Sequence, residues 1–332
     1  MFKKILAYAG ILIGSLNTYA GQAPLKKVYI SKVADHPALD KTVEGILKAL
    51  SDNGFNQYET LDFKIESCQA NTAIASQIAS KYVNQKADVV VGVGTIAAQS
   101  YMRYAIKGET KLVFSSVTDP YKAELLKEGE SSSKNVTGIS NFIPIKEQIL
   151  FIQKILPSLK TLGILYNEGE ANSVVLVERL EKECADLGIL LIKQTVSKTS
   201  EVPQAAVKLS NQVDAVFITN DSTALSSFQC IVKAALDKKD TKGNNTPIPV
   251  FVSDTDIVKE GALAALGPNQ FDIGYQTGGL IAKILKGEDI STLCMQYPKK
   301  TELYLNQEMA EKIGISFPND LLEQASVVLK TS

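Results

Sequence analysis

The sequence is poor in the side chains that most catalytic and metal sites require. It contains one histidine, His36, so a His-rich metal site is excluded, and any Ser-His-Asp or Cys-His mechanism would depend on that residue. Arg103 and Arg179 are the only arginines among 35 basic residues, which leaves few sources for a two-pronged clamp on a carboxylate or phosphate. We therefore expect anions to be bound by hydroxyl groups and backbone amides, and we expect no metal and no cofactor.

The chain also lacks a surplus of charge of either sign. Lys plus Arg is 35 and Asp plus Glu is 36, so nothing in the balance favours nucleic acid or an anionic membrane as a partner. Charged residues make up 21% and hydrophobic residues 45%, as in ordinary globular proteins. A chain of 332 residues is then most simply two domains that share one cleft.

No apolar run is long enough to cross a bilayer. Lys3 and Lys4 precede an apolar run from Ile5 to Leu16, and Thr18-Tyr19-Ala20 offers small residues at the positions that signal peptidase reads. The run is shorter than the ~20 residues of a spanning helix, so an uncleaved anchor is the weaker alternative. Residues 1–20 are predicted to be a signal peptide cleaved near Ala20, and the mature chain to be free in the periplasm.

The four cysteines are widely spaced and form no Cys-x-x-Cys pair or metal knuckle; they are Cys68, Cys184, Cys230 and Cys294. Isolated thiols are the favoured interpretation, and at least one disulfide is the alternative, because an oxidising compartment would permit it.

Short β-branched runs alternate with amphipathic stretches, a pattern typical of parallel strands joined by crossover helices. Strands are predicted at 28–33, 60–65, 89–92, 112–115, 162–166, 190–196, 215–219 and 250–253. Helices are predicted at 37–50, 72–82, 145–156, 173–187, 222–236 and, after the last strand, 273–285. The fold class is α/β, with two doubly wound parallel-sheet lobes joined by a hinge of several strands.

The chain is expected to cross between the lobes three times. The first crossing is predicted in the segment 135–144, and two more around the helix at 273–285 and the tail from Leu303. Lobe 1 would comprise 24–141 plus 267–296, and lobe 2 would comprise 142–266 plus 297–332.

In such sheets, ligands bind beyond the carboxyl ends of the strands. The residues at these ends carry hydroxyls and carboxylates in both halves; they are 35–37, 94–97, 115–120, 167–173, 220–223 and 253–256. Helix capping explains any one of these loops, but all of them together would face one another across a cleft.

The segment 92–97 matches the dinucleotide fingerprint Gly-x-Gly-x-x-Ala, yet it follows the third strand and lacks the acidic residue expected about 20 positions later. The same geometry suits a ligand carboxylate, bound by the Thr95 hydroxyl and the amides of Ile96 and Ala97. His36, followed by Pro37, is expected to cap a helix or line the cleft.

The ordered motifs of the chain resemble those of a known family, the periplasmic substrate-binding proteins of ABC transporters related to tryptophan and tyrosine uptake. The resemblance runs from about Val28 to Leu322 and is carried by 36–40, 93–95, 114–120, 135–138, 163–167, 169–173, 253–256, 261–267 and 276–278. It implies a type I periplasmic-binding fold, capture of a small ligand for an ABC permease of the inner membrane, no chemistry on the ligand, and a monomer.

The resemblance also implies site residues. Thr95, Ala97, Ser116 and Thr118 would serve the carboxylate side of the ligand, and Asn172, Asp221 and Asp254 would serve an ammonium or polar group. Asp35 and His36 complete the predicted site. An amino acid, with an aromatic one favoured, is the expected ligand, although Asp35, Asn141, Tyr121 and Tyr275 depart from the usual family pattern.

Other functions remain as alternatives. A periplasmic sensor subunit for a membrane receptor would use the same two lobes. A hydrolase lacks support, because the chain has no Gly-x-Ser-x-Gly elbow and no Walker loop.

Overall fold

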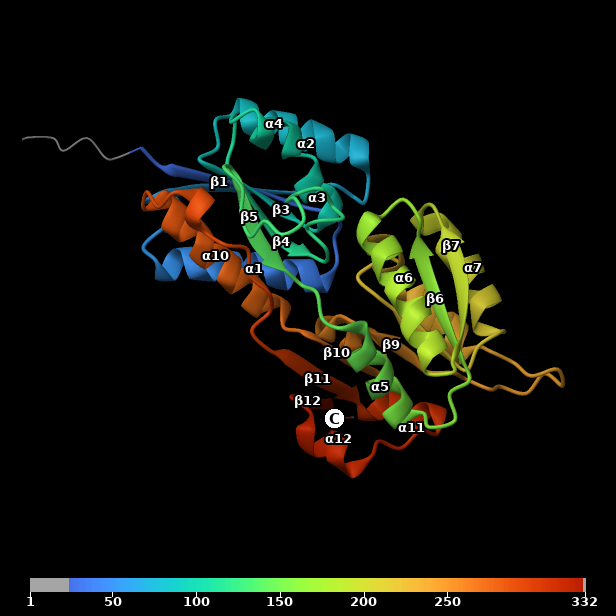
Figure 1. Cartoon of the computed structure of the whole chain (residues 1–332). Helices are drawn as coiled ribbons and strands as arrows, with labels where there is room; N and C mark the ends of the chain where they lie inside the picture. The colour runs from blue at the N-terminus through green and yellow to red at the C-terminus, as the bar shows by residue number, and fades with distance from the viewer. Residues whose placement is uncertain (1–23, 331–332) are drawn as a thin grey trace, which may run out of the picture.

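The computed structural model describes residues 24–330, which form two α/β lobes, each built around one sheet. In Figure 1 the lobe with β1 to β5 lies beside the lobe with β6 to β12, and helices flank both sheets. The predicted fold class is confirmed. The predicted signal peptide lies outside the described residues.

The sheet of the first lobe has the strand order β2-β1-β3-β4-β5, and all its pairings are parallel. β3 has the sequence Val-Val-Val-Gly-Val and is buried throughout, as expected for a strand covered on both faces. The strands are β1 (Lys26–Lys32), β2 (Leu61–Ser67), β3 (Val89–Val93), β4 (Leu112–Val117) and β5 (Val136–Ser140).

The sheet of the second lobe has the order β12-β11-β10-β9-β8-β6-β7, and β10 and β11 form an antiparallel pair within it. Its strands are β6 (Thr161–Asn167), β7 (Leu190–Val196), β8 (Ala215–Ile218), β9 (Val250–Val252), β10 (Ala264–Pro268), β11 (Thr301–Asn306) and β12 (Val327–Leu329).

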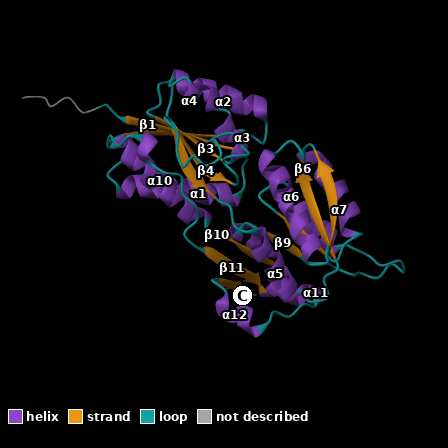
Figure 2. Ribbon diagram, in the orientation of Figure 1, coloured by secondary structure: helices purple, strands orange, loops and turns teal. Residues whose placement is uncertain are grey.

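Figure 2 shows how the helices cover these sheets. The first lobe carries α1 (Pro37–Asp52), α2 (Thr72–Asn84), α3 (Thr95–Gln99), α4 (Met102–Ile106) and α10 (Gln270–Leu285). The second carries α5 (Ile145–Ile155), α6 (Ala171–Asp186), α7 (Val202–Ser210), α8 (Ser222–Leu225), α9 (Phe228–Leu236), α11 (Gln307–Ile313) and α12 (Asn319–Gln324). Short 3-10 turns lie at η1 (Thr199–Glu201), η2 (Thr255–Glu260) and η3 (Ile290–Thr292). Local sequence explains several helix starts: Pro37 stands in the first turn of α1, and the side chains of Asn71 and Asn269 cap α2 and α10.

α10 packs closely against α1, although the two helices are far apart in the sequence (Figure 1). A Cβ atom at Gly274 would lie 1.9 Å from the carbonyl oxygen of Thr42, and one at Gly278 would lie 2.5 Å from that of Ile46. Glycine is therefore required at both positions, and the close contact sets the first turn of α10 beside Thr42.

The chain crosses between the lobes three times, as predicted: from β5 to α5, from β10 to α10, and from η3 to β11. Two crossings pair with each other, because the amide of Ser140 donates to the carbonyl of Gln296 at 2.9 Å, and the Gln296 amide donates to Gly138 at 3.0 Å. Two of the three hinge segments are thus hydrogen-bonded to each other.

Some predicted elements were wrong. The segment read as the first crossing contains β5, and the strand at 250–253 is not the last of the second half, because β10, β11 and β12 follow it. β11 alternates with polar residues and β12 has only three residues, while β10 is apolar but consists of Ala, Leu, Gly and Pro instead of the β-branched residues typical of strands. The helix predicted at 222–236 is two helices, α8 and α9.

All four cysteines are free thiols, with Cys68 and Cys184 buried and Cys230 and Cys294 exposed, so the favoured interpretation is confirmed. Among residues 24–330, no helix has the length and apolarity that a bilayer crossing requires.

Candidate ligand-binding cleft between the lobes

The carboxyl ends of the strands of both lobes meet at a cavity, where open α/β sheets place their ligands. It is lined by Val33, His36, Leu39, Gly94, Thr95, Ser116, Thr118 and Asn141 from the first lobe, and by Asn172, Asn220, Ser222, Leu225, Asp254 and Gln270 from the second lobe and the crossing into α10. The cavity volume is about 20 Å³, which holds about one water molecule. A larger ligand can therefore enter only if the lobes separate.

Most of the predicted site residues come together at this cavity. His36, Thr95, Ser116, Thr118, Asn172 and Asp254 line it. Asp35, Ala97 and Asp221 do not line it.

Thr95 reaches the cavity because Gly94 turns the chain sharply before it. Gly94 has a φ of +87°, and a Cβ atom there would lie 2.5 Å from the Val33 side chain. Ala97 points into the core of the first lobe and does not line the cavity. Arg103 belongs to a separate helix, α4, and its guanidinium donates to the Tyr104 hydroxyl.

His36 precedes α1, and its side chain lines the cavity without capping the helix. Burial lowers the pKa of His36 to about 4, so the ring is neutral at pH 7, and its Nδ1 atom has no hydrogen-bond partner among the described residues. Asp35 is exposed and forms an ion pair with Lys32 at 2.9 Å, which turns it away from the cavity.

The hydroxyl groups at the end of β4 are already bonded within the protein. Ser116 has a φ of +53° at an irregularity in the pairing of β4 with β5, and its Oγ atom donates to Gln270 Oε1 at 2.9 Å. Thr118 donates to Asn141 Oδ1 at 3.2 Å. These contacts fix the orientation of both side chains at the cavity wall.

Asp221 lies behind the wall of the second lobe. Its carboxylate accepts hydrogen bonds from the amides of Asn167 and Ala224, each at 2.7 Å, and so caps α8. Asn172, in front of it, donates to the carbonyl of Asn220 at 2.6 Å. The structure thus gives Asp221 a bonding role inside the lobe rather than a place on the cavity.

Glu170 supports the same loop. Its oxygens accept hydrogen bonds from the amides of Ser222 (2.9 Å) and Thr223 (3.0 Å) and from the Thr223 hydroxyl (2.8 Å). Burial raises the pKa of this carboxyl, and the charge of neighbouring Asp221 raises it further, whereas the three hydrogen bonds lower it. Together the two carboxyls anchor the loop that carries Asn220 and Ser222.

Asp254 is the only acidic side chain that lines the cavity among the described residues. It stands before η2 but makes no capping hydrogen bond with its side chain; instead Oδ1 accepts a hydrogen bond from Gln270 Nε2 at 2.6 Å. Burial raises the pKa of Asp254 to about 7, the Gln270 hydrogen bond acts in the opposite direction, and the charge of Asp256 adds to the rise. The side chain is therefore a buried acceptor that can take up a cation.

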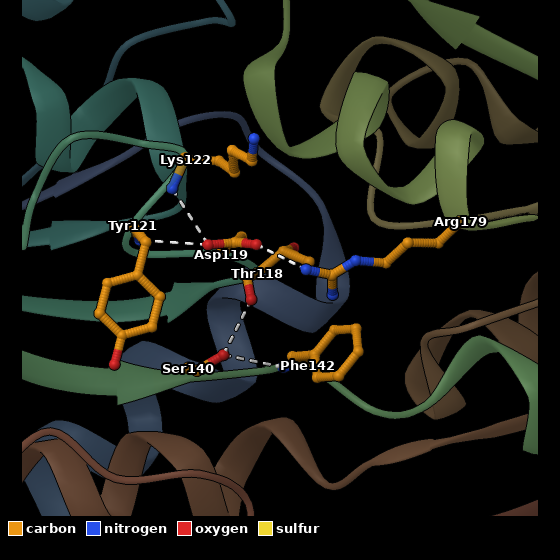
Figure 3. A network of polar contacts seen from close by, with 7 residues as sticks. All are labelled: Thr118, Asp119, Tyr121, Lys122, Ser140, Phe142 and Arg179. Atoms are coloured by element: carbon orange, nitrogen blue, oxygen red, sulfur yellow. Dashed lines mark hydrogen bonds and ion pairs between the residues drawn. The ribbon is translucent and has the colours of Figure 1, made fainter. Parts of the chain in front are cut away.

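A polar network joins the lobes at the edge of the cleft, as Figure 3 shows. Arg179, on α6, forms an ion pair with Asp119 of the first lobe at 2.7 Å, and the guanidinium lies 4.6 Å from the centre of the Phe142 ring. The other oxygen of Asp119 accepts hydrogen bonds from the amides of Tyr121 and Lys122.

Several lining residues were not among the predicted site residues. Asn220 and Ser222 flank the predicted Asp221 in the same loop, so the strand-end rule pointed to them. Asn141 and Gln270 follow β5 and β10, which were not recognised as strands. No sequence signal pairs Arg179 with Asp119.

Comparisons with known proteins agree on one family. The family described as ABC transporter substrate binding protein matches residues 27–329. The chain is 29% identical to a protein named tyrosine-binding protein from Clostridioides difficile, over 87% of this chain and 81% of the relative.

Two solved structures are similar along almost the whole chain. One is an ABC domain from Streptococcus pneumoniae in complex with L-Trp, 26% identical, covering 92% of this chain and 100% of that chain with a TM-score of 0.83. The other is a ligand-free, open substrate-binding protein from Clostridium difficile, 30% identical, with the same coverage and a TM-score of 0.66.

These matches do not favour the alternative of a sensor subunit. Proteins of this family bind small solutes outside the cytoplasm for ABC transporters and are not an enzyme family. The chain belongs to the ABC transporter substrate-binding proteins.

Proposed function

We propose that the cleft binds an aromatic L-amino acid. The observation that carries the proposal is the polarity of the cavity: one carboxylate, Asp254, lies on the side of the second lobe, while the hydroxyls of Thr95 and Thr118 lie on the first. Among the described lining residues there is no lysine or arginine. A zwitterion suits this arrangement, because its ammonium group can pair with Asp254 and its carboxylate can accept from the Thr95 hydroxyl and from amides. The Thr118 hydroxyl would have to give up its hydrogen bond to Asn141 before it could donate to the ligand.

The aromatic class is supported by two relatives, one named for tyrosine and one solved with L-Trp. Val33, Leu39 and Leu225 give the cavity an apolar portion against which a ring can pack once the cleft widens.

We propose that binding closes the hinge. The chain superimposes better on the relative solved with L-Trp than on the open, ligand-free one, which supports a closed arrangement of the lobes here. With the ligand bound, the lobes would stand slightly further apart than in this arrangement, because a cavity of about 20 Å³ holds no amino acid, and closer together than in the open form. The predicted lobes, 24–141 with 267–296 and 142–266 with 297–332, would move as units about the three crossings.

We also propose that residues 1–20 are a signal peptide removed near Ala20 and that the mature protein is a periplasmic monomer. It delivers its ligand unchanged to an inner-membrane permease. Intact-mass analysis of the exported protein should give a chain that begins near Gly21. A retained Met1 would contradict this.

The ligand class is tested by a thermal-shift screen of the mature protein against single amino acids, nucleosides and sugars, followed by calorimetric titration. L-tryptophan or L-tyrosine should raise the melting temperature, since a ligand that binds only the folded state stabilises it. Solution scattering should show a smaller radius of gyration with the ligand bound. A shift with sugars alone, or none with any amino acid, would overturn the proposal.

A further inference from the structure

Gln270 lines the cleft at the point where the chain leaves β10 and enters α10. Its side chain is buried, with 1% exposed, and both polar ends of the amide are bonded. Oε1 accepts hydrogen bonds from the hydroxyls of Ser116 (2.9 Å) and Thr42 (3.1 Å), both in the first lobe. Nε2 donates to Asp254 Oδ1 of the second lobe at 2.6 Å.

The chemistry of these partners fixes which way the amide points. When Asp254 is ionised it can only accept hydrogen bonds, so the NH₂ group faces Asp254, and the carbonyl oxygen is left to accept from the two hydroxyls. The backbone adds to this constraint, because Gly274, one turn along α10, brings the helix against Thr42. The amide of Gln270 is thereby held in a single orientation before any ligand arrives.

This arrangement leaves one oxygen of Asp254 for a ligand. Gln270 bonds to Oδ1, the Asp254 side chain makes no capping hydrogen bond, and Oδ2 accepts no hydrogen bond from the described residues, while Asp254 lines the cavity. We propose that Gln270 is a positioning residue for ligand binding, which orients the Asp254 carboxylate toward a cationic group of the ligand and ties it to the first lobe. The inference rests on the proposed function insofar as it takes an ammonium group as the cation.

A neutral amide suits this task better than a charged partner. A lysine or arginine at position 270 would pair with Asp254 and compete with the ligand, whereas the amide donates a hydrogen bond and leaves the negative charge available. The charged groups around this turn are Asp256 and Lys259 in η2, Lys41 and Glu44 on α1, and Glu302 on β11; His36 faces the same cavity as a neutral ring.

The test replaces Gln270 by methionine, which has a similar length and no amide. Gln276→Met is the matched control, because Gln276 lies on the same helix, is half-buried, and bonds only to a carbonyl of α10. Calorimetric titrations use three probes: L-tryptophan, tryptamine, which lacks the carboxylate, and indole-3-propionate, which lacks the ammonium group.

Gln270→Met should weaken binding of L-tryptophan and tryptamine about tenfold or more at pH 7, while binding of indole-3-propionate changes less than about twofold. The midpoint of the affinity against pH should also move to higher pH, since the hydrogen bond that favours the ionised carboxylate is lost. Equal losses for all three probes would mean that Gln270 only holds the lobes together, and unchanged affinities would remove the role; either result overturns the inference.

A second measurement separates this inference from the ligand proposal. Carbon NMR of the ligand-free protein, with Asp254→Asn used to assign the signal, reports the titration of Asp254 directly. Gln270→Met should move that titration to higher pH and Gln276→Met should not. If the wild-type protein binds no aromatic amino acid, the ligand proposal fails, whereas an unmoved Asp254 titration is what overturns the positioning role.

Discussion

The Arg179 guanidinium, on the second lobe, contacts the Asp119 carboxylate of the first lobe at 2.7 Å. Asp119 is largely buried and accepts two backbone hydrogen bonds, so its position is fixed, while Arg179 can move with α6. Because each partner belongs to a different lobe, the pair exists only when the lobes are close together. It therefore stabilises the closed state without touching the cavity.

Arg179→Ala should weaken binding of L-tryptophan roughly twofold to tenfold, because the closed state loses an attraction that the open state never had. The effect is modest since the Arg179 side chain is 40% exposed and water screens the pair. Titration at low and high salt checks the cause: salt should weaken wild-type binding more than binding by the variant.

The second arginine of the chain supplies the control. Arg103 bonds to Tyr104 within the first lobe, so Arg103→Ala should leave both the affinity and its salt dependence unchanged. Equal effects of the two substitutions would contradict a closing role for Arg179.

Asp254→Ala should weaken binding of an ammonium-bearing ligand at least about tenfold, because closure leaves the ligand charge without its partner. Melting of the empty protein should change little, because the side chain caps no helix and the lost hydrogen bond from Gln270 is offset by removal of a buried, desolvated carboxyl. Calorimetry beside an unliganded melting curve checks both. Full affinity with a lowered melting temperature would assign Asp254 a purely structural role.

Asp221→Ala should affect stability and not ligand contact, the opposite of Asp254→Ala. This carboxylate caps α8 and accepts from two backbone amides, so its loss should lower the free energy of unfolding by about 0.5–2 kcal/mol or somewhat more. Denaturant unfolding of the empty protein measures the loss. An unchanged midpoint would contradict the capping role.

The contrast between these two aspartates shows what the sequence could and could not provide. Both follow an apolar strand and precede a helix, so the pattern predicts the same position for each. Their roles differ because the loop that carries Asp221 is bonded to Asn167 and Glu170 within its own lobe. Asp254 is instead bonded to Gln270, which belongs to the first lobe. Contacts between distant segments decide the role, and local patterns do not contain them.

The same limit explains the missed strands. The strongly apolar strands were found because burial on both faces leaves continuous Val, Ile and Leu runs, as in β3. β11, with the sequence Thr-Glu-Leu-Tyr-Leu-Asn, has exposed positions, and β12 has only three residues. β10 is buried and apolar, but its Ala, Gly and Pro residues are poor strand formers, so the strand was missed and Gln270 with it.

The single histidine gives a pH dependence that can be assigned to one residue. Burial lowers the pKa of His36 to about 4, with Lys32 acting in the same direction and Asp40 and Asp35 against it. Between pH 6.5 and about 4 the unfolded chain binds the proton more strongly, so this group lowers the stability as the pH falls through that range. The loss should be on the order of 2–4 kcal/mol.

Proton NMR should show one imidazole signal that titrates near pH 4 in the folded protein and near 6.5 in urea. His36→Gln should flatten this part of the stability profile. A folded-state titration at the ordinary value would refute the burial argument.

The last prediction concerns the contact between α1 and α10. Gly274→Ala places a Cβ atom 1.9 Å from the carbonyl oxygen of Thr42, which is backbone and cannot rotate away, so the helices must separate. We expect a loss of about 1–3 kcal/mol or more in the free energy of unfolding. Gly279→Ala, on the same helix, meets no atom within 4 Å, and it should stabilise the protein by about 0.5–1 kcal/mol through helix propensity. Urea unfolding of both variants measures the difference in stability. Because both variants replace glycine by alanine in the same helix, helix propensity cannot explain why one is destabilised and the other stabilised. Stabilisation by both would mean that the close approach of α10 to Thr42, and with it the placement of Gln270, is not enforced by glycine.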